Sequence, residues 1–184
     1  MRIAWGISGA GHLLKESIEV METLSGKHEV KVFLSRAGEE VARMYGVLEQ
    51  IGDFPIVRES KQGFAFPPCG AFNLKRFDVF VISPATSNTV AKIRLGIADS
   101  LLSCCASQAL KSKVPLILVP TDSKHIVETR APNGQVFMIY PRKVDLEHLE
   151  ALRDEGVIIL EHPKEVPRTL EAAKEGVRRV IKLD

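Results

Sequence analysis

Short apolar segments alternate along this chain with longer segments in which apolar residues recur at helical spacing. Met1 to Ser8 is a continuous apolar stretch closed by Gly9, and His12 to Leu24 carries leucine, isoleucine and methionine at helical intervals. Glu29 to Ser35 alternates apolar and polar residues with a β-branched bias, and helix formers fill Gly38 to Tyr45. The pattern predicts two successive strand–helix units.

The same alternation resumes in the second half of the chain. Asp78 to Ser83 is apolar on both faces, which is typical of a central parallel strand covered on both sides by helices, and Pro84 is expected to end it. Val114 to Val119 predicts another buried strand, ended by Pro120. The other expected elements are helices Thr86–Leu95, Ile97–Lys111 and Asp145–Asp154, short strands Gln135–Tyr140 and Val157–Leu160, and a final helix from about Val166 to Lys182.

The segment from Gly46 to Phe72 interrupts this regular order. Glycine and proline residues punctuate it, so the sequence predicts a long irregular segment. Segments of this kind are usually functional lids or interface segments.

Repeated strand–helix units define the fold class. Right-handed crossovers return each strand to one sheet, so the order of elements predicts a doubly wound, mainly parallel sheet. We expect an α/β protein with a Rossmann-like three-layer α/β/α sandwich. A length of 184 residues with 45% hydrophobic residues allows a real core, and one domain spanning residues 1–184 is expected.

Composition excludes several classes of function. A formal net charge of +2 gives no basic excess for gripping a nucleic-acid backbone. No apolar run approaches the roughly 20 residues that span a bilayer, and the first residues are interpreted as a strand and not as a signal peptide. The 3 cysteines cannot form a paired disulfide framework, which favours a reducing compartment such as the cytoplasm.

We expect the ligand-binding residues in the loops that follow the carboxyl ends of the parallel strands, because ligands bind there beside helix N-termini. The first such loop runs from Gly6 to His12, with small residues around Ser8. Its glycines follow G-x-x-G-x-G, which is not the dinucleotide fingerprint, and the residues of a P-loop are absent. A phosphate site and a simple tight turn therefore both remain open. Ser35, after the second strand, is interpreted either as a helix cap or as a phosphate ligand.

The loop after the central strand carries the strongest signal. Four consecutive polar residues, Thr86 to Thr89, follow it, although one would suffice to cap a helix. This excess predicts a ligand rich in hydrogen-bond acceptors. Lys92 lies one turn beyond Asn88 and would reach a phosphate or ribityl chain, although an isolated lysine is more often solvated.

Two motifs together resemble a known family. The first loop, GISGA, combined with PATSNTVAKIRLGIADSLL, is similar to the homo-oligomeric flavin-containing flavoproteins, which include phosphopantothenoylcysteine and lantibiotic cysteine decarboxylases, flavin prenyltransferases and dihydromethanopterin reductases. The resemblance covers about Met1 to Asp122. Ala131 to Leu160 looks most like the archaeoflavoprotein and dihydromethanopterin reductase branch.

The resemblance implies non-covalent FMN, with the phosphate held by the first loops and the flavin ring near a subunit interface of a trimer. Gly46 to Phe72 and Ile97 to Lys111 are then expected to pack between subunits. The residues that the resemblance, together with the loop positions, assigns to the cofactor are Ser8, Gly9, Ala10, Ser35, Pro84, Ala85, Thr86, Ser87, Asn88, Thr89, Lys92 and Thr121.

Departures from the family pattern decide the expected subclass. The decarboxylases carry a catalytic histidine eight positions before the aspartate that opens the central strand, and here Gly70 stands at that distance from Asp78. Their P-x-M-N-x-x-M clamp is replaced by residues 120–125, PTDSKH. The prenyltransferases usually place an arginine where this chain has Thr121. We therefore expect an FMN-dependent oxidoreductase that takes electrons from a ferredoxin-like donor and passes them to a small acceptor, with dihydromethanopterin as a candidate.

Two alternatives remain: an electron-carrier or flavin-storage protein without its own substrate, and a diverged phosphopantothenoylcysteine-type decarboxylase. The histidines are scattered, so no metal site is expected. His12 and His125 each follow a strand and are candidate proton donors, although a surface or capping role is commoner. The basic residues of the final helix would dock an acidic partner such as ferredoxin or form a solvated face; they are Lys174, Arg178, Arg179 and Lys182.

Overall fold

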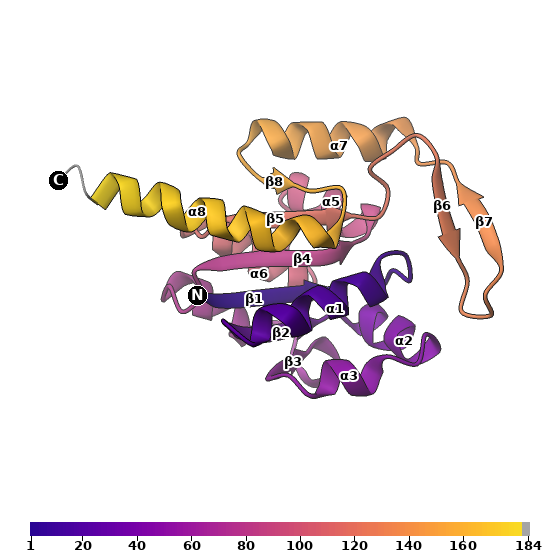
Figure 1. Ribbon diagram of the computed structural model, residues 1–184, viewed down its shortest axis with the longest axis horizontal. Coiled ribbons are helices and arrows are strands. Elements are labelled where there is room, and N and C mark those ends of the chain that lie inside the picture. Colours follow the sequence, from indigo (N-terminus) through magenta and orange to yellow (C-terminus); the bar gives the residue numbers. More distant parts are fainter. Residues whose placement is uncertain (182–184) are drawn as a thin grey trace.

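A computed structural model describes the backbone of residues 1–181 and the side chains of residues 1–173. Within that part of the chain, six strands form one sheet in the order β3-β2-β1-β4-β5-β8, and every neighbouring pair is parallel (Figure 1). The strands are β1 (Arg2–Ile7), β2 (Glu29–Leu34), β3 (Ile56–Arg58), β4 (Val79–Ala85), β5 (Leu116–Pro120) and β8 (Ile158–Ile159). The predicted Rossmann-like, doubly wound parallel sheet is confirmed.

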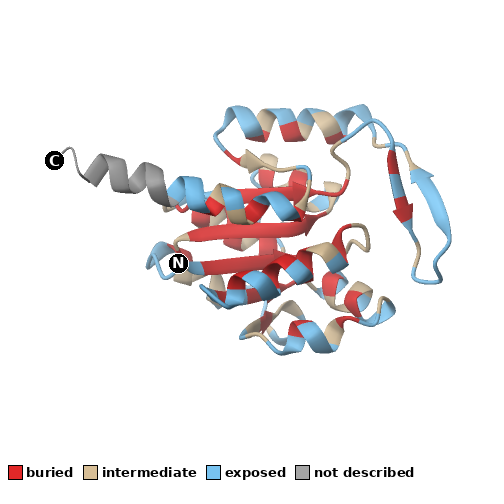
Figure 2. Ribbon diagram, viewed as in Figure 1, coloured by how far each residue is buried: buried red, intermediate tan, exposed pale blue. Residues whose placement is uncertain are grey.

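Alternate side chains of the strands enter two separate cores, because successive residues of a strand point to opposite faces. Ala4, Phe33 and Phe80 pack on one face, whereas Trp5 and Val81 pack on the other. The first face is covered by α4 (Gly70–Asn73), α5 (Ser87–Arg94), α6 (Leu101–Lys111) and α7 (Lys143–Asp154). The second is covered by α1 (Leu14–Ser25), α2 (Arg36–Met44), α3 (Leu48–Gly52) and α8 (Val166–Ile181). The sheet is therefore the middle layer of three, and its central strands are buried (Figure 2).

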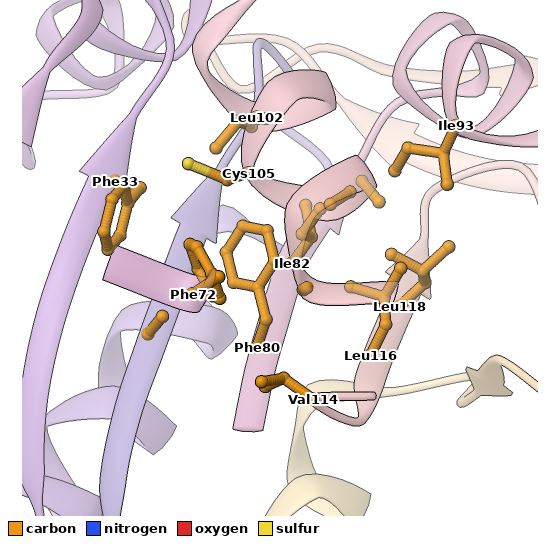
Figure 3. Packing of buried hydrophobic residues seen from close by; sticks show 14 of the residues in the cluster. Phe33, Phe72, Phe80, Ile82, Ile93, Leu102, Cys105, Val114, Leu116 and Leu118 are labelled. Atoms are coloured by element: carbon orange, nitrogen blue, oxygen red, sulfur yellow. The ribbon is translucent and has the colours of Figure 1, made fainter. Parts of the chain in front are cut away.

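An aromatic cluster anchors the first core. The ring of Phe72 lies 4.9 Å from that of Phe80, 5.1 Å from that of Phe77 and 5.8 Å from that of Phe33, measured between centroids. Figure 3 shows Phe72 between the strands that carry Phe33 and Phe80. These contacts fix the short helix α4 on the sheet.

The strand order places a topological switch point between β1 and β4. From β1 the chain builds outward through β2 and β3, and it then returns to β4 and builds in the other direction through β5 and β8. In open parallel sheets, ligands bind in the crevice outside the carboxyl ends of the strands at such a point. The loops after β1 and β4 are therefore the first place to look for a site.

The segment from Gly46 to Phe72 is more regular than predicted. It contains α3, the edge strand β3, two 3₁₀ turns, η1 (Glu59–Lys61) and η2 (Pro67–Cys69), and the start of α4. Each element is five residues or shorter, too short to give a periodic pattern in the sequence. The prediction of an irregular segment is thus wrong in detail, because tertiary pairing with β2 forms β3.

Two further boundaries differ from the prediction. Pro84 does not end the central strand: β4 continues to Ala85, which pairs with Pro120, and the register with β5 shifts between Ile82 and Ala85. The missing N–H of Pro84 therefore falls where the ladder is irregular. The helix expected from Ile97 begins only at Leu101, where the side chain of Ser100 caps it.

A two-stranded antiparallel hairpin stands apart from the sheet. It consists of β6 (Val127–Arg130) and β7 (Val136–Ile139) and projects beyond the body of the molecule (Figure 1). The strand expected over Gln135–Tyr140 is therefore correct in kind, but its partner β6 was not predicted. Among the described residues, no helix combines the length and apolar character needed to cross a membrane.

Candidate functional site

Ser8 joins the loops that follow β1 and β4. Its hydroxyl donates to the carbonyl oxygen of Pro84 at 2.7 Å and accepts from the N–H of Thr86 at 2.9 Å. The residue is buried, and its own N–H also reaches Pro84 O at 3.2 Å. The proton of Ser8 is thus used within the protein, so the geometry supports a role in holding the two loops together; direct contact with a phosphate stays a prediction.

Replacing Ser8 with alanine is expected to destabilise the protein by about 1–3 kcal/mol, because the part-buried Thr86 N–H loses its acceptor and Pro84 O loses one of its two donors. Urea unfolding followed by circular dichroism measures this change. Ser25→Ala removes an exposed serine whose hydroxyl donates to Glu22 O at 2.7 Å, and it should cost less than about 0.5 kcal/mol. Equal effects of the two substitutions would contradict the assignment.

The loop after β1 presents main-chain N–H groups without internal acceptors. The N–H of Ala10 bonds to Ser8 O at 2.9 Å, whereas no described residue accepts from the N–H of Gly9, Gly11 or His12. These groups precede α1, whose N-terminus adds partial positive charge. The loop therefore offers a neutral donor set suited to an anion.

The loop after β2 lies directly against the loop after β1. A Cβ on Gly9 would come within 2.5 Å of the Cβ of Ala37, and one on Gly38 within 2.6 Å of Ile7 O. Both positions therefore require glycine for this close approach. Ser35 caps α2 by accepting from the N–H of Gly38 at 2.9 Å, which confirms its capping role, and no described residue takes its hydroxyl proton.

The loop after β4 carries the polar residues that the sequence singled out. Thr86 caps α5 by accepting from the N–H of Thr89 at 3.3 Å, and the two hydroxyls lie 3.0 Å apart. Asn88 is exposed and its side chain has no hydrogen bond to any described residue. Ser87 donates to a carboxylate oxygen of Asp122. The structure thus brings the loops after β1, β2 and β4 to one edge of the sheet, as predicted.

Asp122 is the residue of this edge that the sequence analysis missed. It follows β5, the neighbour of β4, and its Oδ2 accepts from Ser87 and, at 3.3 Å, from the hydroxyl of Thr121. Thr121 is buried, and its N–H bonds to Ala85 O at 3.0 Å. The available signal was the position of a carboxylate two residues beyond the end of a buried strand.

The two candidate proton donors lie in different environments. His12 is half-buried and borders a cavity of about 380 Å³ between the loop after β1, Tyr45 and the turn end of the hairpin at Arg130. Burial lowers the pKa of His12, the carboxylates of Glu16 and Asp122 oppose that shift, and the charge of His162 adds to it. His125 is exposed after β5 and does not border this cavity.

Burial of His12 predicts a pH dependence of stability. Because its folded pKa lies below the ordinary value of 6.5, the unfolded chain takes up the proton first as the pH falls. The free energy of unfolding that depends on neutral His12 is therefore fully present above pH 6.5 and is lost as the pH falls below that value. Between about pH 8 and pH 5 the wild type should lose more free energy of unfolding than His12→Asn, as measured by urea titrations. A parallel loss in both proteins would contradict the burial of His12.

Lys92 does not stand free beside the polar loop. Its ammonium donates to both carboxylate oxygens of Asp99, at 2.8 and 2.9 Å, and this contact lowers the pKa of Asp99. The pair joins α5 to the connection before α6. Contact of Lys92 with a cofactor stays a prediction.

The remaining candidates contribute little to this edge. Burial raises the pKa of the Cys105 thiol, and Cys104 Sγ lies 3.1 Å from Ala98 O. Within the part of the chain that the structure describes, no group of three or more histidine, cysteine or acidic residues could hold a metal ion. The side chains of the basic residues in the final helix lie outside the described residues.

A separate cavity of about 650 Å³ lies at the opposite, amino edge of the sheet, where Arg2, Lys31 and Phe54 line it.

Comparisons with known proteins agree with the fold. The family model described as Flavoprotein matches residues 1–182. A dihydromethanopterin reductase (acceptor) of Methanosarcina mazei is 45% identical over 141 residues, covering 71% of this chain and 59% of the relative. The chain thus spans about three fifths of that relative's length. An uncharacterized protein of Methanocaldococcus jannaschii is 36% identical over 175 residues, covering 92% of this chain and 94% of the relative.

A solved structure matches over nearly the whole length. DmrB of Burkholderia xenovorans in complex with FMN, described as a cubic protein cage for redox transfer, has a TM-score of 0.81 at 32% identity, covering 96% of this chain and 97% of that one. Together with the family match over residues 1–182, this likeness confirms the resemblance drawn from the two loop motifs. The chain belongs to the flavoprotein family.

Proposed function

We propose that this protein is an FMN-dependent oxidoreductase whose cofactor lies at the carboxyl edge between β1 and β4. The observation that carries the proposal is the set of unpaired main-chain N–H groups at Gly9, Gly11 and His12, beside the free hydroxyl proton of Ser35. The relatives named dihydromethanopterin reductase and the FMN complex of DmrB support the same chemistry.

The residues at this edge fit FMN. A phosphate accepts hydrogen bonds but donates few, and the loops after β1 and β2 offer donors without a cluster of lysines. A ribityl chain and a flavin ring carry further acceptors and donors, which Asn88, Thr86 and Thr89 match. The closeness of the two loops, which excludes a Cβ at Gly9 and Gly38, keeps these donors in one place.

Each group has a defined part in this proposal. FMN, when bound, supplies the hydride or electron transfer. The N–H groups of Gly9, Gly11 and His12 and the hydroxyl of Ser35 would hold the phosphate, while Ser8 fixes the loop after β4 against the loop after β1. The N-terminal residues of α5 orient the rest of the cofactor. His12, kept neutral to lower pH by burial, is placed to exchange a proton with a small acceptor.

We also propose a ferredoxin-like electron donor and a small acceptor, with a reduced pterin such as dihydromethanopterin as the candidate. The relatives named for dihydromethanopterin support the pterin. The three free thiols, Cys69, Cys104 and Cys105, fit a reducing compartment such as the cytoplasm. All of residues 1–184 would form one FMN-binding domain.

Stopped-flow absorbance tests the reaction. The protein is loaded with FMN, reduced anaerobically with reduced ferredoxin and mixed with 7,8-dihydropterin. The proposal predicts that ferredoxin bleaches the flavin band near 450 nm and that the pterin restores it faster than buffer alone. A protein that cannot be loaded with FMN would contradict the cofactor, and a reduced flavin indifferent to every small acceptor would favour an electron carrier.

A homotrimer, or a multiple of trimers, is proposed for the assembly. Phe64, Ile97 and Leu110 are large apolar side chains exposed on the single chain, and they fall within residues 46–72 and 97–111, the two segments expected between subunits. The cage described for DmrB supports an oligomer. Light scattering at micromolar concentration should give at least three times the mass of the chain, and a monomer would contradict the assembly.

A further inference from the structure

Asp122 holds its carboxylate in a fixed position at the carboxyl edge. Ser87, at the start of α5, donates to Oδ2, and the hydroxyl of Thr121, the residue after β5, lies 3.3 Å from the same oxygen and 3.4 Å from Ala85 O, its two possible acceptors. Thr121 is itself buried and bonded through its N–H to Ala85 O at 3.0 Å. Two elements of the scaffold therefore set the orientation of the carboxylate.

The other oxygen of this carboxylate has no partner within the described part of the chain. No hydrogen bond reaches Oδ1, and no described lysine, arginine or histidine lies within ion-pair distance of Asp122, although the residue is half-buried. A carboxylate accepts hydrogen bonds and donates none when ionised, so Oδ1 offers a charged acceptor next to Ser87. An anionic or acceptor-only ligand group would be repelled there.

We propose that Asp122 is a specificity-determining residue that accepts a hydrogen bond from the amino-pyrimidine edge of the electron acceptor. This inference rests on the proposed function and adds the recognition of its substrate. The 2-amino group and the adjacent ring N–H of a pterin are donors that match Oδ1, and a hydrogen bond from such a donor to a carboxylate is charge-assisted. Ser87 and Thr121 act as positioning residues that hold the carboxylate.

A pair of ligands that differ at position 2 of the pyrimidine ring tests the proposal. In 7,8-dihydrolumazine a carbonyl oxygen replaces the 2-amino group of 7,8-dihydropterin and N1 gains a hydrogen, so the donor at position 2 becomes an acceptor while the N3–H is kept. Dissociation constants are measured with the oxidised, FMN-loaded protein by titration calorimetry. The wild type should bind the pterin at least about tenfold more tightly than the lumazine, as expected for a hydrogen bond to a charged group.

Variants separate recognition from folding. Asp122→Asn should weaken pterin binding about tenfold and remove most of the preference, because an amide can turn its NH₂ toward the lumazine oxygen. Ser87→Ala keeps the carboxylate and should retain the preference while weakening pterin binding by a smaller factor. Asp154→Asn changes an exposed aspartate at the end of α7 and should leave both constants unaltered.

The outcomes distinguish this inference from the proposed function. A wild type that binds no FMN overturns both. FMN-loaded wild type that binds the two ligands equally overturns only the role of Asp122, as does Asp122→Asn with an unchanged preference. FMN-loaded wild type that binds neither ligand overturns the pterin as the acceptor and, with it, the role of Asp122. In turnover assays the KM for dihydropterin should rise about tenfold in Asp122→Asn with little change in kcat; a fall in kcat alone would also overturn it.

Discussion

Replacing Gly9 with alanine is expected to weaken FMN binding by about a hundredfold or more. The new Cβ would lie 2.5 Å from the Cβ of Ala37 and 3.1 Å from its carbonyl carbon, so the backbone of one loop must move. A displacement of about 1 Å of a binding group costs on the order of a hundredfold in well-organised sites. Quenching of flavin fluorescence during titration measures the dissociation constant.

The control for this substitution is Gly26→Ala. Gly26 lies at the end of α1, and a Cβ there would meet only Thr23 O at an ordinary 3.7 Å. It should bind FMN as the wild type does. If Gly9→Ala also bound FMN with wild-type affinity, the close approach of the two loops would have no bearing on the cofactor.

Replacing Phe72 with alanine is expected to cost about 3–5 kcal/mol of unfolding free energy, because the ring is fully buried and its removal leaves a cavity. Its contacts with Phe33, Phe77 and Phe80 would all be lost. The loss should appear as a lower urea midpoint with an unchanged m-value. Phe72→Leu, which keeps most of the apolar volume, should cost roughly 1–2 kcal/mol. Equal losses in the two variants would contradict the packing of α4 on the sheet.

The central sheet could be predicted from the sequence because strands buried on both faces leave continuous apolar runs in it. β1, β4 and β5 read as continuous apolar runs, and between them stand helices long enough to show a period. The short edge strand β3 and strand β6 of the hairpin left no such pattern. Both exist because of pairing with a partner strand, which local periodicity does not encode.

The candidate site was predictable as a set of loops but not as a network of contacts. Small and polar residues after β1, β2 and β4 indicated the edge at which they meet. The partners of Ser8, by contrast, lie at Pro84 and Thr86, and that of Ser87 lies at Asp122. These contacts join residues far apart in the chain, so only the folded structure shows that Ser8 ties loops together and that Asp122 belongs to the site.

A crystal structure of this protein grown with FMN tests the central claim most directly. We expect the phosphate to lie within hydrogen-bond distance of the N–H groups of Gly9, Gly11 and His12 and of the hydroxyl of Ser35, with the ring beside the start of α5. FMN bound instead in the cavity of about 650 Å³ at the amino edge of the sheet, beside Arg2 and Lys31, would contradict it.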